Sequence, residues 1–83
     1  MVKITAISII KVEQRKFKQV KESLEKINEI KRILLLSGEF DIILEIEIDE
    51  PEELWNLFVD KIDKIDGIIE TNTHIVIKEV VIK

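Results

Sequence analysis

The sequence predicts an α+β fold with the element order β-α-β-β-α-β, and three patterns carry this prediction. Four segments are rich in β-branched residues, and two others repeat apolar residues at spacings of three and four. A Ser-Gly-Glu turn between the second and third strands leaves room only for a hairpin. This is the ferredoxin-like order, in which right-handed crossovers place both helices on one face of a four-stranded antiparallel sheet.

The whole chain, residues 1–83, is expected to form one domain, because smaller pieces could not bury a core. The first strand is predicted at 2–12, where both alternating sets of side chains are largely apolar, as in a central strand covered on both faces. A helix of about 14 residues follows, with an apolar stripe at helical spacing. Asn28 is its stop signal, and the stripe comprises Phe17, Val20, Leu24 and Ile27.

The hairpin strands are predicted at 30–37 and 40–49. Every second residue from Phe40 to Ile48 is apolar, so this side of the strand is expected under the helices. The second helix begins after Asp49, a possible cap, with Pro51 in its first turn. It is expected to end at Asp66-Gly67, with a buried stripe of Leu54, Leu57, Phe58, Ile62 and Ile65. A long final strand is predicted at 68–82.

The sheet face opposite the helices is predicted to lack a cover. Ile43 and one alternating set each from 4–10 and 33–36 would lie on it. At about 25 cal/mol per Å², exposing several such side chains forgoes several kcal/mol, and soluble monomers seldom show so large an apolar patch. We expect the sheet to pack on another sheet, most simply that of a second copy in a two-fold dimer.

Composition excludes several classes of site and suggests an address. The chain has no cysteine, so disulfides, thiolate zinc sites and cysteine nucleophiles are excluded. No run of about 18 apolar residues predicts a membrane span, and a cytoplasmic location is expected. A net charge of −4 disfavours direct nucleic-acid binding. The wealth of Ile, Lys and Glu fits a thermophilic source.

Charge is unevenly distributed along the chain. Residues 1–32 hold nine Lys/Arg and four Asp/Glu, whereas residues 33–83 hold four and thirteen. Two solvated helix faces of opposite charge explain this pattern. Complementary pairing between copies of the chain is the alternative.

No residue set in the sequence predicts catalysis, a metal site or a cofactor. His74 is the only imidazole and has no second ligand at a recognisable spacing. The acids at 49–53 fit a helix start better than paired catalytic carboxylates or a calcium loop. Phosphate-cradling loops, nucleophile elbows and HExxH motifs are absent from the sequence.

Two short stretches are candidate ligand contacts. In the turn formed by Ser37, Gly38, Glu39, Phe40 and Asp41, glycine allows a ligand to approach the backbone and Asp41 can accept the protons of an ammonium group. An ordinary hairpin turn is the alternative interpretation. Thr71 and Thr73 place two hydroxyls on one side of the last strand, where edge-strand threonines are also unremarkable.

The order and spacing of these motifs resemble the ligand-sensing RAM domain of the Lrp/AsnC transcription regulators. The resemblance spans nearly all 83 residues and rests on a strand ending in Ser-Gly-Glu-Phe-Asp, then a helix with an acidic start, then Gly67-x-x-x-Thr71-x-Thr73. It implies a subunit that dimerises through its sheet and often assembles into a ring of four dimers, an octamer. It also implies that an amino-acid effector binds between subunits, at Ser37 to Asp41 with Thr71 and Thr73 nearby.

The chain departs from the family pattern at three places and at its start. Ser37 replaces the usual Thr, Phe40 replaces the usual Tyr, and His74 stands where an apolar residue is commoner. The family's helix-turn-helix DNA reader is expected before the first strand, which Met1 begins here. The sequence therefore resembles a stand-alone RAM protein, or a segment cut from a longer regulator.

The resulting hypothesis is a non-enzymatic, amino-acid-sensing oligomerisation module for transcription regulation. Without its own DNA reader, it would act by assembling with DNA-binding Lrp/AsnC relatives. One alternative is a purely structural module without an effector. Another is a small dimeric α+β-barrel enzyme, which needs a polar cavity between sheet and helices and is disfavoured by the apolar helix-facing side of 40–48.

Overall fold

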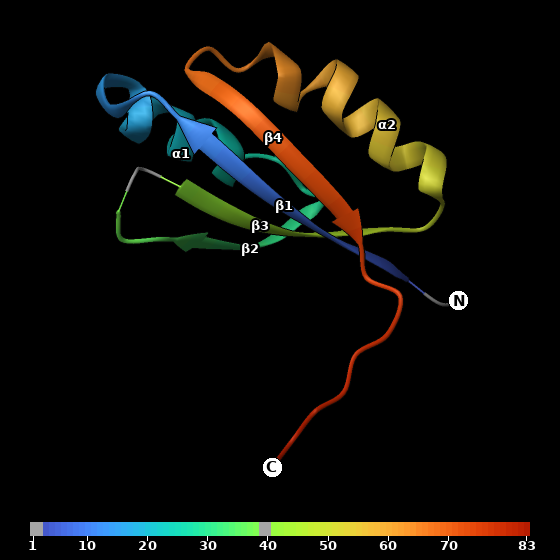
Figure 1. The fold of residues 1–83 in the computed structure, drawn as a ribbon. Helices are drawn as coiled ribbons and strands as arrows, with labels where there is room; N and C mark the ends of the chain where they lie inside the picture. Colours follow the sequence, from blue (N-terminus) through green and yellow to red (C-terminus); the bar gives the residue numbers. More distant parts are fainter. Residues whose placement is uncertain (1–2, 39–40) are drawn as a thin grey trace.

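The computed structural model describes residues 3–38 and 41–83 and has the element order β-α-β-β-α-β (Figure 1). Two 3₁₀ turns, η1 and η2, join the regular elements. The strands are β1 (Ile4–Val12), β2 (Ile30–Leu35), β3 (Asp41–Ile48) and β4 (Ile68–Ile75). The helices are η1 (Gln14–Lys16), α1 (Phe17–Glu25), α2 (Pro51–Asp60) and η2 (Ile62–Lys64).

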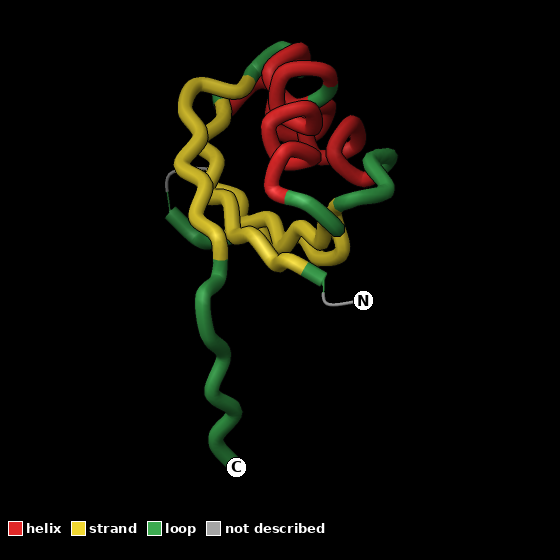
Figure 2. The backbone as a smooth tube through the Cα atoms, turned by 90° about the vertical axis from the view of Figure 1, so that its right-hand side faces the viewer, coloured by secondary structure: helices red, strands yellow, loops and turns green. Residues whose placement is uncertain are grey.

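The four strands form one antiparallel sheet in the order β2-β3-β1-β4. Figure 2 shows the two layers: both helices lie on one side of the sheet, and its other side is bare. This arrangement follows from two right-handed crossovers, because each returns its helix to the same face. The predicted fold is confirmed.

The core lies between the sheet and the helices. In β3 every second side chain is buried from Ile42 to Ile48, as the alternation in the sequence predicted. The residue that was expected to begin this row, Phe40, lies outside the described residues. Buried side chains from the neighbouring strand and the helices complete the core: Ala6, Ile10, Val12, Val20, Leu24, Ile27, Leu57 and Ile62.

The second helix differs from its prediction at both ends. Its N-cap is Glu50 rather than Asp49, and no side chain caps it; Asp49 instead pairs with Lys3 at 3.1 Å. The helix ends at Asp60 and tightens into η2 rather than continuing to Asp66. The tighter turn still buries Ile62 while the chain bends toward β4.

The last strand is also shorter than predicted, because β4 ends at Ile75 and not near residue 82. The backbone amide of Val76 donates to the carbonyl of Thr5 at 2.8 Å, and β1 itself begins at Ile4. In this register, residues beyond Ile77 would face positions that precede the first residue of β1, so β1 gives them no partner. Residues 76–83, here called the tail, run away from the body of the protein (Figure 1).

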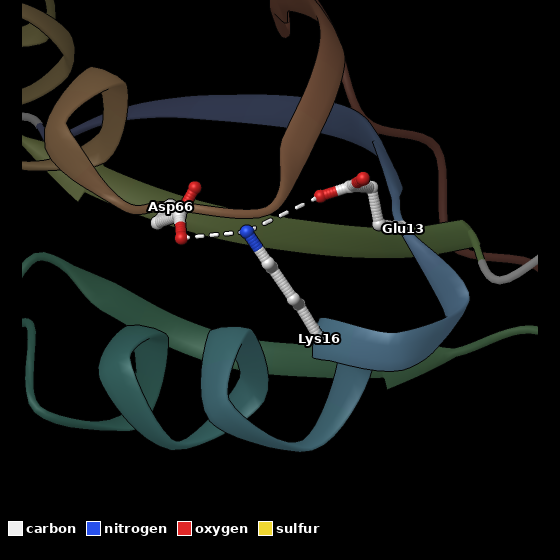
Figure 3. Close-up of polar contacts among 3 residues, drawn as sticks. All are labelled: Glu13, Lys16 and Asp66. Atoms are coloured by element: carbon white, nitrogen blue, oxygen red, sulfur yellow. Dashed lines mark hydrogen bonds and ion pairs between the residues drawn. The ribbon is translucent and has the colours of Figure 1, made fainter.

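Gly67, directly before β4, lies close to the segment that leads from β1 into α1. Its carbonyl accepts a hydrogen bond from the amide of Glu13 at 2.8 Å, and its φ is +110°. The Lys16 ammonium lies 2.7 Å from the Asp66 carboxylate and 3.6 Å from that of Glu13 (Figure 3). The hydrogen bond to Asp66 raises the pKa of Lys16 above its ordinary value. These contacts are exposed, so the close backbone approach at Gly67 is the more constraining feature.

Replacing Gly67 with alanine is expected to destabilise the protein through two separate effects. A Cβ there would lie 2.8 Å from Cβ of Lys16 and 2.9 Å from Cγ2 of Val20. We expect about 1–3 kcal/mol from backbone strain at positive φ and a similar further amount from overpacking.

Gly38→Ala is the matched control, because Gly38 has φ +111° but no atom within 4 Å of an added Cβ. Denaturant unfolding of both variants measures the difference. Equal losses of stability would contradict the packing role of Gly67.

Candidate functional site

The bare sheet face carries a row of apolar side chains at its centre. Ile9 of β1 lies opposite Ile43 of β3, which in turn lies opposite Leu34 of β2. Ile9 is 41% exposed and Leu34 is 42% exposed, and Ile7 lies on the same face by strand alternation. No helix of the described residues 3–38 and 41–83 covers this row, because both helices lie on the other side of the sheet.

One end of this bare face carries a cluster of polar side chains. Lys11 of β1 lies between Asp41 of β3 and Glu70 of β4 in the strand register. Together with Ile9 and Asn72 these residues line a hollow of about 220 Å³. The Asn72 amide donates to the Glu70 carboxylate at 3.1 Å. The hollow therefore offers two carboxylates, one ammonium and one amide within a small space.

The Ser37–Gly38 turn stands next to this end of the sheet. The amide of Leu36 donates to the carbonyl of Asp41 at 3.0 Å and closes the hairpin, while Ser37 and Gly38 are exposed. The open space beside Gly38 leaves its backbone accessible to a ligand or to another chain. Two further predicted site residues, Glu39 and Phe40, lie outside the described residues.

Thr71 and Thr73 lie on the opposite, helix-covered side of the sheet. Thr73 pairs in register with Ser8, and their hydroxyl oxygens are 2.9 Å apart. Ser8 is fully buried, so this hydrogen bond satisfies a polar group that would otherwise be costly. The register places Thr71 opposite buried Ile10.

Within one chain, then, the predicted ligand contacts form two separate groups. Asp41 is in β3, whereas both threonines are in β4, with β1 between them. The faces also differ, because the Asp41 register partner is Lys11 and that of Thr73 is Ser8, which lie on opposite sides of β1.

Sequence reasoning did not single out Lys11, Glu70, Asn72 or Ser8. The signal that could have found the first two was the strand order of the predicted fold, which sets β1 between β3 and β4. Whether Lys11 and Glu70 lie directly opposite each other still depends on the strand register. The register shifts at Lys11/Val12, so counting residues from the start of β4 does not predict this pairing.

The surface ion pairs, such as Lys21 with Glu25 and Arg32 with Glu45, are accessible to solvent and contribute little to stability. Glu29, which immediately precedes β2, has a pKa below its ordinary value. Burial acts to raise this pKa, but a hydrogen bond from its own backbone amide and the Lys61 ammonium, 3.2 Å away, together lower it.

Across residues 3–38 and 41–83, no three His, Asp or Glu residues are grouped so as to hold a metal ion. In this same part of the chain, no helix is long and apolar enough to cross a membrane.

A Thr73→Val substitution separates the structural role of Thr73 from a ligand-binding role. It removes the partner of the buried Ser8 hydroxyl, so we expect a loss of about 1–3 kcal/mol in the free energy of unfolding. Adding Ser8→Ala should restore most of that stability, since no buried hydroxyl is then left unpaired. Urea unfolding of the single and double variants tests this, with Thr71→Val as the control, and an unchanged stability of Thr73→Val would contradict it.

The comparisons with known proteins agree with this architecture. The sequence pattern of the Lrp/AsnC ligand binding domain matches residues 5–83. Among curated relatives, the HTH-type transcriptional regulator FL11 of Pyrococcus furiosus is 36% identical over 75 residues, which cover 90% of this chain and 49% of FL11. The chain spans about half the length of the curated relatives it matches.

Two solved structures share the fold at lower sequence identity. Escherichia coli AsnC has a TM-score of 0.86 at 20% identity, covering 96% of this chain and 54% of that one. The transcriptional regulator NMB0573 of Neisseria meningitidis, solved as a complex with L-Met, has a TM-score of 0.82 at 18% identity, covering 93% and 51%.

Proposed function

The chain belongs to the family of Lrp/AsnC ligand-binding domains, and we propose that it is a non-enzymatic amino-acid sensor that assembles with copies of itself. Its residues 1–83 would act as one domain, in the cytoplasm, as part of transcription regulation. The observation that carries the proposal is the bare sheet face, whose apolar centre and polar end lie next to an accessible turn.

The first part of the proposal is a two-fold dimer formed through the bare face. Ile9 and Leu34 are exposed and Ile43 is half-buried, and burying this apolar row against a second sheet removes it from water. In a two-fold dimer this row packs against the same row of the other copy, so both copies use the same patch.

Ile9→Asp tests this dimer, because it places a charge at the centre of the proposed interface. We expect the variant to elute and sediment as a 9.7 kDa monomer while keeping its far-UV circular dichroism. Leu35→Asp is the control: Leu35 is similarly exposed at 47% but pairs with buried Ile42 on the helix side of the sheet. A dimer that survives Ile9→Asp would rule out this interface.

The second part of the proposal is an amino-acid effector bound between copies. The Asp41 carboxylate can accept hydrogen bonds from an α-ammonium group, and exposed backbone amides of the Ser37–Gly38 turn suit a carboxylate. Thr71 and Thr73 would complete the site only if they came from another copy, because in one chain they lie across the sheet from Asp41. An effector held in this way stabilises only the assembly that forms its site.

Thermal unfolding against each of the twenty amino acids tests the sensor role. A true effector at 100 times its Kd should stabilise the chain by about 2.7 kcal/mol and raise the melting temperature. Asp41→Asn should remove that response while leaving the ligand-free melting temperature nearly unchanged, because Asp41 is at a strand end and only partly buried.

Asp63→Asn is the matched control, since Asp63 is exposed in η2, away from the turn. If none of the twenty amino acids changes the melting temperature or the size of the assembly, the sensor role is wrong. The dimer would then remain as a purely structural module, a second candidate that the Ser8–Thr73 bond favours by giving Thr73 a structural partner.

The link to transcription is proposed to be indirect. The chain would assemble with DNA-binding Lrp/AsnC relatives, as a ring of dimers of up to eight subunits, and so report effector binding to them. The barrel-type enzyme remains without support: among the described residues Ser8 is the buried polar side chain between sheet and helices, and it is bonded to Thr73.

A further inference from the structure

The tail at residues 76–83 has the composition of a strand but lies outside the sheet. Five of its eight residues are Val or Ile, and Ile77 is 97% exposed, although β-branched residues favour a half-buried, pleated environment. Both alternating sets contain apolar side chains, with Val80 and Ile82 on one and Ile77 and Val81 on the other. A strand of this kind is normally covered on both faces.

The outer edge of β4 pairs with no other strand of the described chain. The strand order places β4 at the end of the sheet, with β1 as its only neighbour among the described strands. It is eight residues long, contains no proline or lysine, and its pairing is irregular only at its start, opposite Lys11/Val12. With Glu70 as its only Asp, Glu, Lys or Arg and this single irregularity, it has few of the features that normally protect an edge from pairing with another strand.

An apolar flank of α2 lies above that edge. Leu54, Leu57 and Phe58 face the core, whereas Glu53, Asn56 and Asp60 line a hollow with Glu29, on the side of α1 and β2. Trp55 and Val59 are one helical turn apart and lie on the third side of α2, which faces β4. They are 71% and 42% exposed. The start of α2 is on this side, since Pro51 and Ile75 line one hollow.

We propose that the tail of one copy adds to the outer edge of β4 in a second copy, as a fifth strand beneath Trp55 and Val59. One apolar set of the tail then packs against this α2 flank. The other set faces the layer that the sheet-stacked partner of the proposed dimer supplies, so this inference rests on assembly but not on an effector. Backbone hydrogen bonds provide affinity and the α2 flank provides the side-chain contact, as in other strand additions.

The tail cannot occupy the edge of its own β4. It continues directly from Ile75, and folding back would need a tight turn at that point, yet residues 74–83 contain no Gly, Pro, Asn or Asp. The other sheet edge, β2, is a poorer acceptor. It is only six residues long, and the exposed residues of the neighbouring α1 are charged or polar, with no apolar flank.

Trp55 is the only tryptophan and reports directly on the proposed contact. In the assembled 83-residue chain we expect blue-shifted emission and weak quenching by acrylamide. Removal of residues 76–83 should shift the emission to that of a water-exposed indole and increase quenching. Val80→Lys in the 83-residue chain should do the same, which guards against a shortened chain that simply folds poorly.

Cross-linking identifies the copy that supplies the tail. Because the sequence contains no cysteine, only the introduced cysteines can react. A Val59→Cys chain is mixed with a Val80→Cys chain of different mass and treated with a short bismaleimide. We expect a mixed dimer as the main product. Lys18→Cys, exposed on α1, replaces Val59→Cys as the control and should give little of it.

Two results would overturn the proposal. One is an assembled chain whose Trp55 emission is unchanged by removal of the tail, with no more mixed product than the control. The other is a cross-link that forms within single chains carrying both cysteines, even at high dilution. Either result leaves the sheet-face dimer standing, because Ile9→Asp tests that interface separately.

Discussion

The alternation of side chains in β1 and β3 is the constraint on which the rest of the structure depends. Successive side chains in a strand point to opposite faces, so Ile42 and Leu44 can be buried only if Ile43 points away from them. Both crossovers return their helices to the same face. One face of the sheet therefore receives the core, and the apolar residues on the other face have no helix above them in the described part of the chain.

This constraint also explains where the chain can interact with other molecules. The apolar centre of the bare face favours a like surface, whereas its Asp41–Lys11–Glu70 end is polar and adjoins the hairpin turn. Since Thr71 and Thr73 lie on the other side of the sheet, a site that used all the predicted contacts would need more than one copy. Assembly and ligand binding would then be thermodynamically linked, as a sensor requires.

Most of the fold could be predicted from the sequence, because its signals are local and agree with one another. The apolar alternation from Ile42 to Ile48, the stripe of Val20 and Leu24, and the hairpin turn each indicated an element that the structure contains. The end of β4 could not be predicted in this way. Residues 76–82 have strand composition, but whether they form a strand depends on a neighbour, and in the register of the sheet residues 78–82 extend past Ile4, where β1 begins.

The candidate site was predicted less completely, for a related physical reason. The turn and the threonines were recognised as motifs, but the side of the sheet to which each residue points depends on register, and motif spacing does not contain it. Thr73 shows the consequence, since its hydroxyl bonds to buried Ser8. Lys11, which no motif indicated, lies beside Asp41, and Glu70 lies on the other side of Lys11.

The central claim is that the chain completes its uncovered sheet with another copy. Sedimentation equilibrium over a range of protein concentrations tests it most directly, because it measures mass without reference to shape. The account predicts a mass of at least two 9.7 kDa chains, in even multiples, and a return to one chain only on strong dilution. A mass of 9.7 kDa at every concentration, with the fold intact, would contradict it.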